Sequence, residues 1–328
     1  MKIFPIFIPH LGCPFACVYC NQHSITKSKI PEPSKISSDI SRFCKFNQNI
    51  EKEIAFFGGT FTHLSQTEQQ DFFDLVQPLL DYKTSIRIST RPDFINENIL
   101  SFCRKNGVKT IELGIQSFSD QVLESSQRKY DSKTAISACK MVKKNNFNLG
   151  IQLMPGLPAF SEKYLLKTIS ETIKIRPEFV RIYPTIVLKN TVLEKWFRDK
   201  KYFPLEIDEA VDIVAEMVNI FEKENIKIIK IGLHSDIEPE NIIAGPYHPS
   251  FGELVRAKIL SERIFNKFEQ DRTLIISPSD ISLFKGFEQK MLNELKQKIQ
   301  INKIPISIDR KLAKNKFAFR DIKAKKWW

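Results

Sequence analysis

The stretch GCPFACVYC contains three of the chain's six cysteines, Cys13, Cys17 and Cys20. Thiolates bind zinc and iron, so this Cys-x3-Cys-x2-Cys spacing predicts a metal centre. A structural zinc site normally takes four protein ligands, and only His10 or His23 is close enough in sequence to be the fourth. An iron–sulfur cube held by three cysteines would instead keep one iron open for another ligand. Unligated thiols are the remaining interpretation.

Composition and the amino terminus indicate the compartment. The 328 residues are 42% hydrophobic and 27% charged, as in an ordinary globular protein long enough for one large domain and a small appendage. The opening MKIFPIFIPH lacks the apolar run and the cleavage site of a signal peptide, and no stretch approaches the about 20 apolar residues of a membrane span. We therefore expect a cytoplasmic protein with no membrane partner. Thiols stay reduced there, which favours a metal site or a catalytic device over disulfides.

Up to about residue 232 the chain alternates apolar, strand-like runs with amphipathic segments of helix length. The predicted strands are KIFPIFI, EIAFF, SIRIS, TIELGI, LGIQLM, EFVRIY and IKIIKIG, and the predicted helices cover 66–80, 96–106, 132–145, 162–175 and 207–224. This alternation indicates parallel β/α units buried on both faces. Because a cysteine loop follows the first strand in place of a glycine-rich phosphate turn, we predict a partial or full parallel (β/α) barrel. In such barrels chemistry occurs at the carboxyl ends of the strands, where this loop falls.

The alternation of strand-like and helix-like segments ends after residue 234, which predicts a second unit. We expect a barrel domain with a C-terminal extension over 1–268, ending in the helix FGELVRAKILSERIFNKF, and a small basic α/β domain over 269–328. In the small domain, LIIS and IPISI predict strands on either side of two short helices. From residue 285 to the end there are 13 Lys or Arg against four Asp or Glu, a balance of +9 within the chain's net +12. This segment is a candidate phosphate-binding surface, or else a solvated lysine-rich end.

The cysteine loop, with Tyr19 just before its last cysteine, resembles the signature of the radical S-adenosylmethionine (SAM) enzymes. The resemblance implies a 4Fe-4S cluster on the three cysteines, with SAM bound to the open iron through its amino and carboxylate groups. It also implies an enzyme that reductively cleaves SAM to a 5′-deoxyadenosyl radical for hydrogen abstraction, supplied by an electron donor such as ferredoxin or flavodoxin. The remaining cysteines, expected as small buried apolar residues in helices, are Cys44, Cys103 and Cys139.

Later stretches extend the resemblance in the expected order at strand ends: FFGGTF, ISTRPDFI, ELGIQSFSDQVLESSQRKYD and LGIQLMPGLP. The glycines of the first would expose backbone groups to a closely approaching ligand, and an arginine of the third can pair with the methionine carboxylate in a forked geometry. Taken singly, a glycine turn, a surface salt bridge and a core amide would explain the same residues. Relatives have a glutamate where this chain has Ser89. The resemblance implies cofactor binding by Gly58, Gly59, Thr60, Gln116, Arg128 and Gln152.

The resemblance covers roughly residues 3–256 and is to the branch that includes the catalytic subunit of Elongator and oxygen-independent coproporphyrinogen oxidase. VRIYPTIVLKNTVLEKW and AGPYHPSFGELV look like Elongator-type segments. The length leaves no space for an acetyltransferase domain, so acetyl-coenzyme A chemistry is not expected. Tyr183 and Tyr247 are candidates for handling the substrate radical, because a phenol can donate a hydrogen atom. A packed tyrosine is the ordinary alternative for each.

Two features indicate the substrate. SDISLFKGFEQKMLNELKQKI resembles half of a KH module, although its Gly-x-x-Gly turn keeps only Gly286. Aromatic residues that could stack on bases follow it: Phe317, Phe319, Trp327 and Trp328. We therefore expect tRNA or another RNA as substrate of a modifying enzyme. The alternatives are a radical SAM oxidoreductase that acts on a small molecule, as the porphyrinogen oxidases do, and a non-catalytic nucleic-acid-binding protein with zinc.

Overall fold

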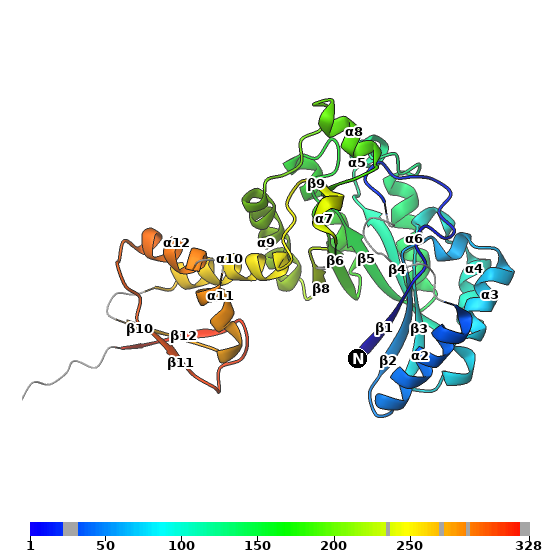
Figure 1. Cartoon of the computed structure of the whole chain (residues 1–328), viewed down its shortest axis with the longest axis horizontal. Coiled ribbons are helices and arrows are strands. Elements are labelled where there is room, and N and C mark those ends of the chain that lie inside the picture. Colours follow the sequence, from blue (N-terminus) through cyan, green and yellow to red (C-terminus); the bar gives the residue numbers. More distant parts are fainter. Residues whose placement is uncertain (22–31, 234–236, 269–271, 287–288, 322–328) are drawn as a thin grey trace, which may run out of the picture. The chain divides into compact units, whose positions relative to one another are not determined.

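The computed structural model describes residues 1–21, 32–233, 237–268, 272–286 and 289–321. The chain divides into two compact units (Figure 1). Unit 1 comprises Met1–Ala210 and Ile220–Pro249, and unit 2 comprises Val211–Asn219 and Ser250–Trp328. The boundary expected between residues 268 and 269 thus falls inside unit 2, because the helix before it shares a core with the C-terminal strands.

Unit 1 is built on a parallel sheet that curves into a half-barrel (Figure 1). In spatial order its seven strands are β1 (Lys2–Phe7), β2 (Lys52–Phe57), β3 (Thr84–Thr90), β4 (Val108–Gln116), β5 (Asn148–Leu153), β6 (Phe179–Ile182) and β8 (Lys227–Ile231). All neighbouring pairs are parallel. The predicted partial barrel is confirmed, and each of the seven apolar runs forms one of its strands. β3 is buried at every position, which explains why its sequence shows no polar face.

Helices connect the strands, and side-chain caps fix where several of them begin. Their bounds are α2 (Pro33–Phe46), α3 (Gln66–Asp74), α4 (Glu97–Lys105), α5 (Asp120–Ser125), α6 (Ser132–Lys144), α7 (Glu162–Ile175), α8 (Val192–Arg198) and α9 (Ile207–Lys223). Ser65 and Glu68 form a capping box at α3, and Asn96, Asp131 and Ser161 cap α4, α6 and α7. These caps set the lengths of the loops that carry the site. Across the described residues, every helix is too short or too polar to span a bilayer.

A short antiparallel ribbon of β7 (Val187–Leu188) and β9 (Ile242–Ala244) was not predicted. Segments of two and three residues show no periodicity that a sequence pattern could reveal. The ribbon matters for the site, because Leu188 and the preceding Ile186 line its cavity.

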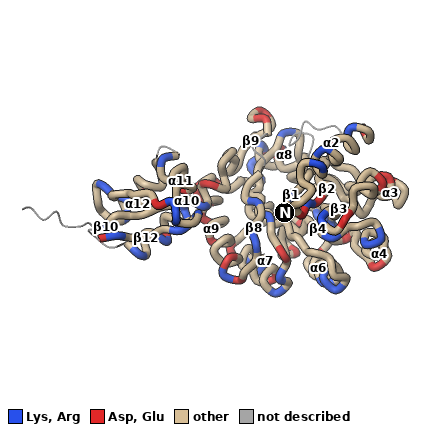
Figure 2. Tube along the Cα trace, turned by 90° about the horizontal axis from the view of Figure 1, so that it is seen from below, with Lys and Arg blue, Asp and Glu red and all other residues tan. Residues whose placement is uncertain are grey.

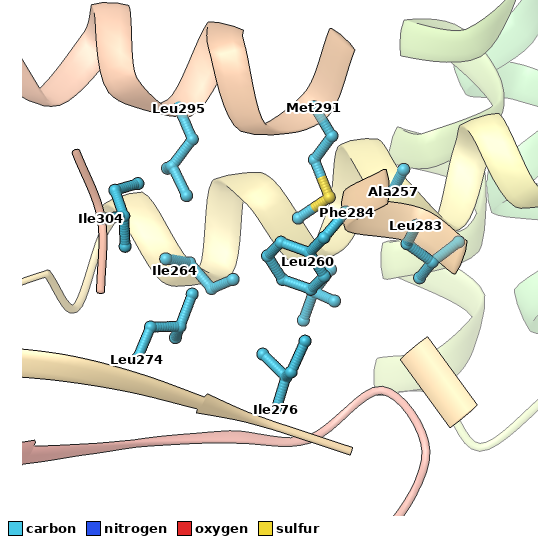
Figure 3. Packing of buried hydrophobic residues seen from close by; sticks show 10 residues of the cluster. All are labelled: Ala257, Leu260, Ile264, Leu274, Ile276, Leu283, Phe284, Met291, Leu295 and Ile304. Carbon is cyan, nitrogen blue, oxygen red and sulfur yellow. The ribbon is translucent and has the colours of Figure 1, made fainter. Parts of the chain in front are cut away.

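Unit 2 contains a three-stranded sheet and helices that share one apolar core (Figure 3). Its elements are α10 (Phe251–Phe265), β10 (Arg272–Ile276), α11 (Ile281–Lys285), α12 (Lys290–Ile299), β11 (Ile306–Ile308) and β12 (Phe317–Asp321). β10 pairs in parallel with β11 and antiparallel with β12. The expected strand, two helices and strand are therefore present, and β12 is an addition.

Two aromatic residues of β12, which were expected to stack on bases, also take part in the packing of unit 2. Phe317 and Phe319 pack against the unit 2 core, and the Phe319 ring lies 5.9 Å from that of Phe268 in an edge-to-face contact. They therefore stabilise the unit, and because both residues remain partly exposed, their stacking on bases stays a prediction. Trp327, Trp328 and the centre of the 286–289 turn lie outside the described residues.

Candidate functional site

A cavity of about 420 Å³ is lined by the half-barrel strands and the loops after them. Of the residues predicted for the site, those on the cavity wall are Cys13, Cys17, Cys20, Gly58, Gly59, Thr60, Gln116, Arg128, Gln152 and Tyr183. Tyr247 is not on this wall and instead packs against a small cluster of Ile186, Leu188 and Ile237. The structure thus brings together ten of the eleven cofactor, metal and radical candidates, drawn from five strand ends.

The cysteine loop after β1 is held against the end of β2 by backbone hydrogen bonds. The His10 N–H donates to the Gly58 carbonyl at 2.9 Å, and the Thr60 N–H donates to the Leu11 carbonyl at 2.9 Å. A Cβ on Gly59 would lie 2.2 Å from the Leu11 oxygen, and a Cβ on Gly12 would lie 2.4 Å from the Thr60 oxygen. Only glycine fits at either position. Gly59 therefore makes room for the cysteine loop, a role that the sequence did not indicate.

The three thiols have different surroundings. Cys13 Sγ lies 3.4 Å from Thr60 Oγ1, and Cys17 Sγ accepts from Arg128 Nη1 at 3.1 Å. Burial, reinforced by the two neighbouring thiols, raises the pKa of Cys20 to about 12 in the metal-free chain. Among the described side chains, no three from His, Cys, Asp and Glu converge closely enough to hold one metal ion. A cube that binds each thiolate at a separate iron does not require such convergence, so the arrangement favours a cluster over a single zinc ion.

Arg128 is a buried cation at the cysteine end of the cavity. Only 4% of the residue is exposed, and its guanidinium donates to Cys17, to the hydroxyls of Tyr19 and Tyr130, and to the Gly114 carbonyl. None of its partners among the described residues is a carboxylate. A buried charge without a counter-charge is unfavourable, so this position fits an anionic ligand or a thiolate.

Arg91 is a second guanidinium at this end, and the sequence analysis did not select it. It forms a forked ion pair with Asp93 at 3.0 and 2.8 Å, and it donates to the backbone carbonyl of Arg128. Its Nη1 lies 3.9 Å from Cys17 Sγ, and its guanidinium lies over the rings of Phe15 and Tyr130 at 5.4 and 5.3 Å. Arg91 thus joins the cysteine loop to the loop that carries Arg128. The position of ISTRPDFI at a strand end is the signal that could have identified it.

Gln116 ends β4 with a left-handed backbone, φ 68°, which is uncommon for a residue other than glycine. The residue is 9% exposed, and its Oε1 is buried with no hydrogen-bond donor in the described structure. A buried acceptor without a partner is costly, and strained backbone conformations concentrate at ligand sites. Gln116 therefore fits a ligand that brings a donor, such as an amino group.

A polar network lies deeper in the half-barrel. Gln152 Nε2 donates to Ser89 Oγ at 3.3 Å and to Glu112 Oε2 at 3.2 Å. Glu112 also pairs with Arg181, whose Nε lies 2.8 Å from Oε2. Glu112, opposite Ser89 on the neighbouring strand, supplies a carboxylate beside it. Glu112 and Arg181 were missed because a charged residue inside a strand gives no sequence pattern for its partners.

These features define a class of protein. The chain matches the radical SAM superfamily over residues 7–171 and the radical SAM C-terminal domain over residues 177–261, so it belongs to the radical SAM superfamily. It is 30% identical over 171 residues to the tRNA uridine(34) acetyltransferase of Methanocaldococcus jannaschii, which covers 51% of this chain and 31% of the relative. It is 27% identical over 249 residues to the heme chaperone HemW of Bacillus subtilis, which covers 72% of this chain and 65% of the relative.

Solved structures agree on the fold. Elp3 of Methanocaldococcus infernus superposes with a TM-score of 0.63 at 20% identity, over 81% of this chain and 63% of that one. Coproporphyrinogen III oxidase of Escherichia coli, described as a radical SAM enzyme, gives 0.51 at 17% identity, over 68% of this chain and 52% of that one. The chain spans about a third of the length of the Methanocaldococcus acetyltransferases it matches, 31% and 32%.

The cofactors of this superfamily are a 4Fe-4S cluster and SAM, and the residues present fit both. Three thiols without a fourth are the donor set that leaves an iron open. Within the described residues Arg128 has no carboxylate partner and Gln116 Oε1 has no donor, so they suit the carboxylate and the amino group of the methionine moiety.

Proposed function

We propose that this chain is a cytoplasmic radical SAM enzyme that modifies tRNA or another RNA. The observation that carries the enzymatic part is the convergence of three thiols, the unpaired Arg128 and the unpartnered Gln116 oxygen on one cavity. Support for RNA comes from the segment of net charge +9 that begins at residue 285 and from relatives named for tRNA uridine(34). Acetyl transfer is not part of the proposal, since only 31% of the acetyltransferase relative is matched.

Each group in the site has an assigned role. Cys13, Cys17 and Cys20 would hold the cluster. When bound, the cluster and SAM supply reductive cleavage of the sulfonium and a 5′-deoxyadenosyl radical for hydrogen abstraction. Arg128 would pair with the methionine carboxylate, and Ile3, Pro5 and Phe7 form an apolar part of the cavity wall. The residues that would hold SAM are Gly58, Gly59, Thr60, Gln116, Arg128 and Gln152.

Unit 2 would supply the RNA contact, and ferredoxin or flavodoxin would supply the electron. Lysine and arginine recur along α12 and the strands of unit 2 in the charge view (Figure 2). Lys298 on α12 is exposed, as are Lys311, Lys314 and Lys316 in the loop between β11 and β12. Exposed lysine and arginine side chains bind the phosphates of a nucleic acid whatever its base sequence, so this surface would suit a tRNA substrate.

Two experiments test the two halves. In the first, the anaerobically reconstituted protein is analysed for iron and for its visible spectrum. We expect a cluster spectrum that is lost in Cys13→Ala, Cys17→Ala and Cys20→Ala and kept in the control Cys44→Ser, because Cys44 lies in α2 and off the cavity wall. A colourless protein that contains zinc would contradict the proposal that the chain is a radical SAM enzyme.

In the second experiment, the loaded protein acts on total tRNA from a strain that lacks it, and hydrolysed nucleosides are analysed by mass. A changed nucleoside supports RNA modification. An unchanged profile, while 5′-deoxyadenosine is being formed, would remove RNA as the substrate.

A small-molecule substrate is the second candidate, favoured by the match to HemW over 65% of that relative and by the fold shared with coproporphyrinogen III oxidase. Binding of bulk tRNA in a mobility-shift assay at two salt concentrations separates the candidates. Salt-sensitive binding supports RNA, whereas no binding at low salt supports the small molecule.

A further inference from the structure

Four charged side chains alternate in sign through the interior of the half-barrel. Glu53 on β2 accepts from Arg87 on β3, whose Nη1 also donates to Glu112 on β4 at 2.6 Å. Glu112 in turn pairs with Arg181 on β6, with Nε at 2.8 Å and Nη2 at 3.1 Å from its two oxygens. The two carboxylates and two guanidiniums together have a net charge of zero. The side chains of the first three are at most 3% exposed, whereas that of Arg181 is 14% exposed.

Of the four, Arg181 is the member that lines the cavity, and Tyr183 lines it beside Arg181. Arg181 Nη1 donates to the Tyr183 hydroxyl at 3.4 Å, so the phenol oxygen already has a donor and its own hydrogen remains for another acceptor. Burial raises the pKa of Tyr183, which keeps that hydrogen in place at neutral pH. The wall therefore presents two donors side by side, from a guanidinium and a phenol.

The cavity wall around this pair combines apolar and neutral polar side chains. The guanidinium of Arg181 lies over the ring of Phe57 at 5.2 Å, and Gln152, opposite Arg181 on β5, lines the same cavity with Ser89. The apolar residues of the wall include Phe7, Phe57, Ile186, Leu188 and Leu233. Since Glu112 already neutralises Arg181, an incoming carboxylate or phosphate would bring a second negative charge to this pair without a second cation beside it. A neutral carbonyl or hydroxyl oxygen could accept from both donors without that penalty.

We propose that Arg181 and Tyr183 form a recognition subsite for an uncharged oxygen acceptor, a carbonyl or hydroxyl on a planar and largely apolar group, and that this subsite rejects anions. The assignment rests on the proposed function only in that the substrate enters this cavity. It also separates the two candidate substrates, because a porphyrinogen bears several carboxylates whereas a nucleobase presents neutral carbonyls.

The test uses two probes that share a shape and differ in charge, benzamide and benzoate. Their binding is measured by ligand-observed NMR on the full chain with Arg128→Gln, which removes the anion-binding cation of the same cavity and serves here as the wild-type reference, and on Tyr183→Phe, Arg181→Lys and a control, Arg104→Lys, in that background. Arg104 is exposed and lies over Phe147 at 5.3 Å, away from the cavity wall. We expect benzamide to bind at least tenfold more tightly than benzoate and the control to match the wild type. Tyr183→Phe should weaken benzamide binding about fivefold, since one neutral hydrogen bond is lost.

The subsite would be overturned if benzoate bound as tightly as benzamide, or if Tyr183→Phe and Arg181→Lys both left benzamide binding unchanged. It would also be overturned if no benzamide bound at 20 mM, which is roughly the weakest affinity expected of a fragment held by two hydrogen bonds. Circular dichroism of each variant shows whether it is folded, and Tyr183→Phe keeps the charges intact if Arg181→Lys does not fold. The probes are also measured on protein without the cluster. If the chain does not bind a cluster, the iron analysis shows this, and the benzamide and benzoate affinities still test the subsite.

Discussion

Arg128 Nη1 donates to Cys17 Sγ at 3.1 Å across 111 positions of sequence. The contact forms because the loops after β1 and β4 reach the same end of the half-barrel. It places a buried guanidinium beside a proposed cluster ligand, so we expect binding of the methionine carboxylate and the geometry of the cysteine loop to depend on one side chain.

Arg128→Lys should weaken SAM binding. A lysine keeps the charge but loses the fork, and one charge-assisted hydrogen bond contributes about 1.5–3 kcal/mol, or about 10- to 100-fold in affinity. The affinity is read from the change that SAM causes in the electron paramagnetic resonance spectrum of the reduced cluster. Iron content is measured alongside, and an affinity within twofold of the wild type would contradict this role.

Arg91→Gln should act through Arg128 and the cysteine loop. It removes the ion pair with Asp93, the bond to the Arg128 carbonyl and the contacts with Phe15 and Tyr130. We expect a shifted cluster reduction potential and a several-fold loss of SAM affinity, partly restored in Arg91→Lys. Arg104→Gln is the matched control, since it also removes a guanidinium over a ring, but at the surface. A potential identical to that of the wild type would exclude the role.

Stability should fall at alkaline pH because of two buried thiols. Burial raises the pKa of Cys103 and of Cys139 to about 12, whereas an unfolded cysteine titrates near about 8.5. Between these values the unfolded chain has released the protons that the folded chain still holds, so the free energy of unfolding decreases as pH rises, by at most about 1.4 kcal/mol per pH unit for each thiol. Below about pH 8.5 these thiols contribute no slope.

Urea unfolding of the metal-free protein at pH 8 and pH 10 measures this slope. The free energy of unfolding at pH 8 minus that at pH 10 should be smaller by about 1–2 kcal/mol in Cys103→Ala than in the wild type, because that variant no longer has the thiol with the raised pKa. Cys44→Ala, at a half-buried position, should change the difference less. Equal differences in all three proteins would show that other groups cause the alkaline loss.

Replacement of Lys311, Lys314 and Lys316 by Gln should lower both the affinity for tRNA and its dependence on salt. Each lost phosphate contact reduces the slope of log K against log salt by about 0.7–0.9. The control replaces three exposed lysines of unit 1, Lys140, Lys163 and Lys200. A slope that falls equally in both triple variants would indicate binding by net charge alone.

Much of the scaffold could be predicted because buried parallel strands are continuous apolar runs. KIFPIFI shows this, whereas TIELGI and EFVRIY each carry a charged residue inside a mainly apolar run, and all three form strands where expected. The cysteine loop could be identified for a similar reason, since three thiols in one short loop carry their chemistry in their spacing.

The charged interior could not be predicted. Arg87 and Glu112 lie in strands that are otherwise apolar, and their pairing depends on which strands are neighbours and on their register. Arg91 was missed because its partners come from three separate loops. Phe317 and Phe319 were assigned to a binding surface because β12 follows a lysine-rich stretch, yet tertiary packing places their rings against a core.

The alternating charges of the half-barrel constrain how the sequence can diverge. Removal of Glu53, Arg87, Glu112 or Arg181 alone would leave this buried group with a net charge, and breaking a buried ion pair typically costs about 3–5 kcal/mol. Homologues that differ at one of these positions should therefore carry a compensating exchange at a neighbour, and these four sites should be inherited as a block.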